Sequence, residues 1–196
     1  AYADMQVGRI LTALRERGLA ENTLIIVTAD HGEAFGEHDE ATHGLLAYDA
    51  TLRVPLIISG PGVPSGRRVR SPAYHRDLVP TLLTFLRLEV PTELTGIDLL
   101  ALPIATNIAA IDDETEKSPR IGYFEAHSPQ IDLGWEKIEG VRSDRWKYTA
   151  WPPPEELYDV VADPKEERNI ASQHAEIVDE MRWHPEEILT AAGGAA

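Results

Sequence analysis

A short apolar run, TLIIVT at residues 23–28, constrains the fold of this chain more than any other feature. Its length and its β-branched residues predict a strand buried on both faces, as in a parallel sheet. Residues 1–17 precede it with a helical pattern, and Gly18 is suited to end that helix. The apolar positions of the pattern are Val7, Ile10, Leu11 and Leu14. Helix, short loop and buried strand together predict an αβ unit, the building block of α/β sheets.

The next elements continue this architecture. The apolar run VPLIIS at 54–59 predicts a second buried strand. Asp77 is placed to cap a helix that runs to about Leu88. Two strands and two helices in alternation favour an open sheet with flanking helices.

The composition changes after residue 119, where short strand patterns replace helical ones. A tight turn at 143–145 would join the last two strands into an antiparallel hairpin. The expected strands are 121–126, 138–143 and 146–150. A helix is expected over 173–190, with a break at Pro185. The sequence therefore predicts an α/β fold followed by a small antiparallel sheet packed with a C-terminal helix.

Charge and composition narrow the classes of function. Acidic residues outnumber basic ones by 33 to 18, and the net charge of −15 disfavours nucleic acid and anionic membrane surfaces as partners. There is no cysteine, so disulfides, cysteine ligands and cysteine nucleophiles are excluded within this chain. The sequence contains no apolar run of membrane-spanning length. Positive potential for an anionic substrate would have to be local, from a metal ion or a few side chains.

Asp30-His31-Gly32 ends the first apolar run and forms the candidate site. In open α/β sheets, sites form at the carboxyl ends of strands. Asp supplies a hard oxygen ligand and neutral His supplies a nitrogen ligand, so the pair predicts metal binding. The alternative is that Asp30 caps the next segment and His31 is a solvated loop residue, since short motifs recur by chance.

The residues around this motif resemble the C-terminal half of the sulfatase catalytic domain, in the alkaline phosphatase superfamily. His43-Gly44 follows twelve residues after His31, and Tyr48 and Arg53-Val54-Pro55 then lead into the second strand. Three further stretches agree in the family's order over roughly residues 2–172. They are YADMQVGRILTALRERGLAENT, HRDLVPTLLTFL and GVRSDRWKYTAWPPPEELYDVVADPKEERNIA. The resemblance implies a partial sulfatase-like sheet with flanking helices.

The resemblance also implies roles for individual residues. Asp30 and His31 are similar to two of the four protein metal ligands of the family. His43 stands where sulfatases place a Lys or His against the ester oxygens, to stabilise charge or protonate the leaving group. A helix-capping or packing histidine is the alternative for His43. The implied ion is calcium, while magnesium, manganese and zinc remain compatible with these ligand types.

Other polar residues near the motif are expected to be structural. His38 is interpreted as a supporting residue, and Glu33 and Glu37 as a solvated loop face. The cations of the predicted hairpin are expected on a solvated sheet edge. These cations are Arg142, Arg145 and Lys147.

The family's nucleophile motif, Cys/Ser-X-Pro-X-Arg, does not occur in this sequence. Ser71-Pro72 and Ser118-Pro119-Arg120 have the wrong spacing. We therefore expect a fragment without turnover of its own: residues 1–105 as the C-terminal portion of a sulfatase-like domain, 106–119 as a connection and 120–196 as a small α+β subdomain. Exposed sheet edges would allow self-association.

Three functions stay open at this point. The first is a sulfatase that cleaves sulfate esters; the second is a phosphodiesterase or a phosphoglycerol or phosphoethanolamine transferase of the same superfamily, acting on phosphate esters. The third is a non-catalytic binding or assembly module. A periplasmic or secreted location is expected from the family resemblance.

Overall fold

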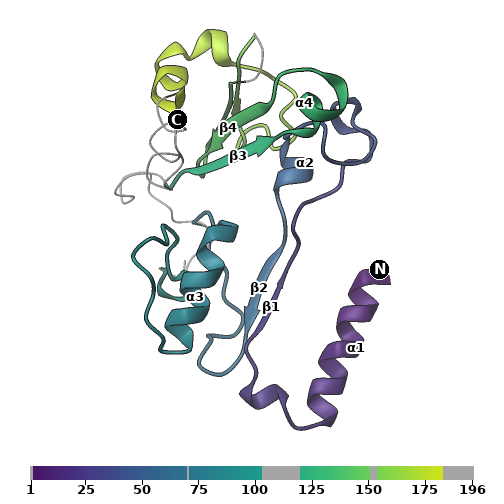
Figure 1. The fold of residues 1–196 in the computed structure, drawn as a ribbon, viewed down its shortest axis with the longest axis vertical. Coiled ribbons are helices and arrows are strands. Elements are labelled where there is room, and N and C mark those ends of the chain that lie inside the picture. The colour runs from purple at the N-terminus through teal and green to yellow at the C-terminus, as the bar shows by residue number, and fades with distance from the viewer. Residues whose placement is uncertain (1, 70, 103–119, 151–153, 183–196) are drawn as a thin grey trace. The chain divides into compact units, whose positions relative to one another are not determined.

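The structure is a computed structural model and describes residues 2–69, 71–102, 120–150 and 154–182 (Figure 1). The chain divides into two compact units. The first comprises Ala1–Asp30 and Val54–Arg68, and the second comprises His31–Arg53 and Val69–Ala196. The expected connection at 106–119 and the expected break at Pro185 lie outside the described residues. The domain limits 1–105 and 120–196 stay a prediction.

The first unit contains one helix and a two-stranded sheet. Helix α1 (Tyr2–Glu16) confirms the predicted helix, and Gly18 ends it in the left-handed conformation with φ +67°. Strands β1 (Ile25–Thr28) and β2 (Leu56–Ser59) form at the two apolar runs. All described residues of this unit are at least partly exposed.

The two strands pair antiparallel, with Ile25 opposite Ser59 and Thr28 opposite Leu56. The expectation of buried, parallel strands is therefore wrong for this pair. An apolar run indicates burial but not strand direction, because direction depends on how the connection between the strands returns.

In the second unit, helix α3 (Leu78–Phe85) follows Asp77 as predicted. Asp77 is fully buried, but its carboxylate does not cap this helix. It accepts hydrogen bonds from the backbone of Tyr74 and Ile97 and pairs with Arg120 at 2.8 Å. Leu82 of this helix is exposed.

Four antiparallel strands form the sheet of the second unit, in the order β3-β4-β5-β6. Strands β3 (Gly122–Ala126), β4 (Ile138–Arg142) and β5 (Trp146–Thr149) confirm the three predicted strands and the hairpin. Strand β6 (Glu156–Asp159) pairs with β5 and was not predicted. Its presence makes β5 an inner strand.

Short helices complete the described chain. Helix α2 (Asp49–Leu52) and helix α4 (Ser128–Leu133) also belong to the second unit, and residues 175–182 are helical. Single 3-10 turns lie at Ala20–Asn22, Glu37–Asp39, His75–Asp77, Leu99–Ala101 and Ala171–Gln173. None of the helices in the described ranges is long and apolar enough to cross a membrane.

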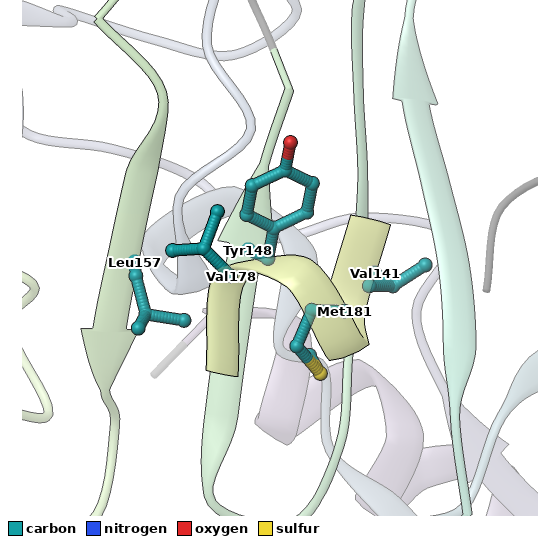
Figure 2. Close-up of a cluster of buried hydrophobic side chains, with 5 residues drawn as sticks. All are labelled: Val141, Tyr148, Leu157, Val178 and Met181. Carbon is teal, nitrogen blue, oxygen red and sulfur yellow. The ribbon is translucent and has the colours of Figure 1, made fainter. Parts of the chain in front are cut away.

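The largest apolar core lies between the sheet and the helical residues 175–182, as Figure 2 shows. Its buried members are Val141, Tyr148, Leu157, Val178 and Met181. The three strand residues occupy one row across β4, β5 and β6, so their side chains share one face of the sheet. The predicted packing of a helix on the small sheet is confirmed.

Candidate active site

The loop at residues 31–53 folds back on itself like a hairpin. The backbone N–H of Ala34 donates to the carbonyl of Thr42 at 2.9 Å, and Gly36 N–H donates to Glu40 O at 2.9 Å. This register places position 34 opposite 42 and position 36 opposite 40. By continuation, position 33 faces position 43 at the open end of the loop.

The tip of this loop turns through two residues with left-handed backbone, His38 at φ 54° and Asp39 at φ 62°. Glu40 follows with only 3% of its surface exposed, and its carboxylate accepts the backbone N–H groups of Leu45 and Leu46 at 2.8 and 3.1 Å. The buried carboxylate thereby fixes the segment on which His43 stands.

His43 and Glu33 are hydrogen-bonded at the open end of the loop. His43 Nδ1 lies 3.1 Å from Glu33 Oε1 and 3.2 Å from the hydroxyl of Thr42. The bond from His43 is the main reason why the pKa of Glu33 lies below its ordinary value, and Thr42 contributes in the same direction. The carboxylate is therefore ionised at neutral pH and accepts a hydrogen bond from Nδ1–H of His43. The other ring nitrogen, Nε2, is then the one that can act on a substrate.

His31 packs against His43, with ring centroids 4.2 Å apart and ring planes tilted by 30°. Its Nδ1 is 2.8 Å from the carbonyl of Gly32. A carbonyl can only accept, so Nδ1 carries a proton and donates it to this bond. A backbone carbonyl on the second ring nitrogen is the usual partner of a metal-binding histidine.

Gly32 fixes the start of the loop against helix α2. Its N–H donates to Thr51 O at 2.7 Å, and a β-carbon at position 32 would lie 2.3 Å from Ala50 O. No side chain fits there without movement of the backbone, so glycine is required for this close approach.

The structure thus brings together two of the three predicted site residues, His31 and His43. Asp30 is exposed and belongs to the other unit, directly before His31 in the chain. Within the described residues, no group of three or more His, Asp or Glu side chains is arranged to hold a metal ion. The carboxylate oxygen of Asp30 and the imidazole nitrogen of His31 are donor types that fit a divalent ion.

Glu33 was missed as a site residue, because its expected role was a solvated loop face. It is about half exposed, but it contacts His43 directly. Glu33 and His43 are ten residues apart, a spacing that neither a helix nor a strand would bring into contact. The indication lies in Gly36 and the following turn, which fold the chain so that the two positions face each other.

The expectation for the hairpin cations is wrong at two of three positions. The side chain of Lys147 is fully buried, and Arg142 is mostly buried in a pair with Asp49 at 3.3 Å. Arg145 is half exposed and pairs with Asp159. His38 has the supporting role expected, since its ring stacks on Tyr48 with centroids 3.5 Å apart.

Residues 1–88 match the family model described as Sulfatase. Arylsulfatase K from Gallus gallus is 30% identical over 187 residues, which cover 92% of this chain and 34% of that protein. Arylsulfatase K from Homo sapiens is 30% identical over 181 residues, covering 90% of this chain and 33% of the relative. The chain thus spans about a third of the length of the curated relatives it matches.

Solved structures give the same assignment of the fold. BT4656, solved in complex with its substrate D-glucosamine-2-N,6-O-disulfate, has a TM-score of 0.78 at 26% identity. The match covers 97% of this chain and 38% of the BT4656 chain. A phosphonate monoester hydrolase from Silicibacter pomeroyi has a TM-score of 0.71 at 26% identity, covering 95% of this chain and 38% of its own. The predicted mixed α/β, sulfatase-like fold class is confirmed.

Proposed function

Because residues 1–88 are sulfatase-family sequence, we propose that this chain supplies part of the active site of a metal-dependent sulfuric ester hydrolase. The observation that carries the proposal is the contact of His31, His43 and Glu33 on one loop, within the stretch that matches the family. Both imidazoles are exposed, so an ester can reach them.

Asp30 and His31 are proposed as two metal ligands. They are consecutive and follow strand β1 closely, and they offer a carboxylate oxygen and an imidazole nitrogen. The bond from His31 Nδ1 to the Gly32 carbonyl supports this role, because a metal-binding histidine usually donates its other ring N–H to such a group. We assign the ion as calcium, which prefers oxygen ligands; when bound, it would withdraw charge from the ester oxygens.

His43 is proposed to act at the leaving oxygen of the ester. Its Nδ1 is held by Glu33, so the ring is oriented and its Nε2 can stabilise charge or deliver a proton as the ester bond breaks. The contact with Glu33 fixes the rotamer of the ring. This is the arrangement of a catalytic histidine oriented by a carboxylate.

The nucleophile is proposed to stand outside these residues, in a longer polypeptide that carries a Cys/Ser-X-Pro-X-Arg motif. The test is hydrolysis of 4-nitrophenyl sulfate by that polypeptide with calcium present. His43→Ala should lower kcat by roughly 10²- to 10⁴-fold, the usual contribution of an acid–base group. His174→Ala is the matched control, because His174 is a similarly exposed histidine that pairs with Glu176 and follows the 3-10 turn Ala171–Gln173.

Two outcomes would contradict the proposal. Faster cleavage of 4-nitrophenyl phenylphosphonate than of the sulfate would transfer the site to phosphoryl chemistry. Equal thermal stability with and without calcium, in both that longer polypeptide and its Asp30→Ala variant, would favour a non-catalytic binding module.

A further inference from the structure

A buried ion pair joins the four-stranded sheet to the loop that bears His43. Lys147 on β5 and Glu166 have side chains that are 0% and 2% exposed, and their Nζ and Oε1 atoms are 2.5 Å apart. Glu166 holds a left-handed backbone, φ 57°, which a residue with a side chain adopts at a cost. A buried charge pair held in this way needs a structural reason, because desolvation opposes it.

The pair reaches the loop through the second carboxylate oxygen. Glu166 Oε2 accepts the backbone N–H of Asp49 at 2.6 Å, at the start of α2. The side chain of Asp49 in turn pairs with Arg142 of β4. One end of the loop is therefore bound to the sheet by two charged groups.

The same ammonium group also lies near the tip of the loop. Lys147 Nζ is 5.2 Å from the ring centroid of Tyr48, on which His38 stacks. His38 Nε2 lies 2.9 Å from the carbonyl of Lys165, the neighbour of Glu166 in the chain. The tip and the end of the loop are thus held at one place on the sheet.

The alternation of side chains in the sheet explains why Lys147 can contact the loop. Arg142, Lys147 and Tyr158 share one row across β4, β5 and β6. The adjacent row of Val141, Tyr148 and Leu157 faces the helical residues 175–182 (Figure 2). Successive rows point to opposite faces, so the cationic row faces the loop and not the apolar core.

We infer that Lys147 and Glu166 are positioning residues for the active-site loop, holding Gly32 and the His43–Glu33 pair in place from the small sheet. The inference rests on the proposed function for its catalytic consequence. The clamp itself is a property of the fold and can be measured without turnover.

The first experiment measures hydrogen exchange of backbone amides in this chain, for the parent, Glu166→Gln and Lys147→Met/Glu166→Gln. Loss of one charge partner should speed exchange at Gly32, Ala34 and Gly36 at least about tenfold more than it speeds exchange of the amides of β4 and β5. Arg145→Met is the control, because it removes a neighbouring cation that is half exposed. Uniform acceleration across loop and sheet, or no change in the loop, would overturn the inference.

The second experiment measures kcat and KM for 4-nitrophenyl sulfate in the active, longer polypeptide. Glu166→Gln should lower kcat about tenfold or more with a smaller change in KM, because misplaced groups lose transition-state contacts first. Glu166→Asp, which keeps the charge, should recover part of the loss, and Arg145→Met should keep parental kcat. Unchanged kcat alongside accelerated loop exchange would refute the catalytic consequence. Absence of sulfatase activity in the parent would instead contradict the proposed function, while the exchange result would still decide the clamp.

Discussion

The Lys147–Glu166 pair allows a stability prediction whose size follows from its surroundings. With Glu166→Gln, the buried ammonium loses its carboxylate partner and lies near the rings of Tyr48 and Phe124, at 5.2 and 5.3 Å. With Lys147→Met, the carboxylate keeps the N–H of Asp49 at 2.6 Å. Each single change leaves an uncompensated buried charge, and we expect a loss of about 3–5 kcal/mol in the free energy of unfolding.

The double variant Lys147→Met/Glu166→Gln should behave differently. Methionine fills the space between the same aromatic rings, and the glutamine carbonyl can still accept from Asp49 N–H. Replacing a buried pair by neutral groups of similar volume is often nearly neutral, so we expect a loss of about 0–2 kcal/mol. The coupling between the two positions should then be at least about 4 kcal/mol.

Urea unfolding at pH 7, followed by tryptophan fluorescence, measures these differences, because Trp146 packs against the core of this unit. Single-variant losses below about 1 kcal/mol would show that the charges remain hydrated in solution. A double variant as unstable as the two single losses combined would show that the positions do not interact. Either result would refute the reasoning from burial.

Three further predictions concern other parts of the fold. Leu157→Ala should lower the free energy of unfolding by about 2–5 kcal/mol in urea, because Leu157 is fully buried in the core; a loss below about 1 kcal/mol would contradict the packing. Gly32→Ala should cost about 1–3 kcal/mol by overpacking against Ala50 O, and an unchanged midpoint of thermal unfolding would contradict that contact. The pKa of Glu155 lies below its ordinary 4.5, chiefly because Arg182 donates to it, so its stabilisation is present above pH 4.5 and is lost as the pH falls through the lowered pKa. Glu155→Gln should flatten the dependence of stability on pH in that acid range, and a dependence identical to the parent's would count against the pair.

The elements that the sequence predicts correctly are those with a local signal. Helix α1 follows from its spacing and from Gly18, and the β4–β5 hairpin follows from alternation around a tight turn. The direction of β2 relative to β1 has no such signal, because it depends on the path of the intervening loop.

The burial of Lys147 was missed for a related reason. Strand β6 contains Leu157 and Tyr158 in a run of only four residues, too short to stand out, and without it β5 looks like an edge strand with solvated cations. The partner Glu166 lies 19 positions away and becomes a neighbour only once β6 is in the sheet. Asp30, His31 and His43 could be proposed through family resemblance, whereas the Glu33–His43 contact depends on the fold of the loop.

The sequestered amine of Lys147 has a practical consequence for chemical footprinting. Acylating reagents attack uncharged, accessible amines, so Lys165 and the partly exposed Lys137 should be labelled while Lys147 is spared. Labelling at Lys147 would then occur only in molecules whose loop has separated from the sheet. The extent of acylation at Lys147, measured by mass spectrometry, would therefore report how often the loop separates from the sheet in the unsubstituted chain.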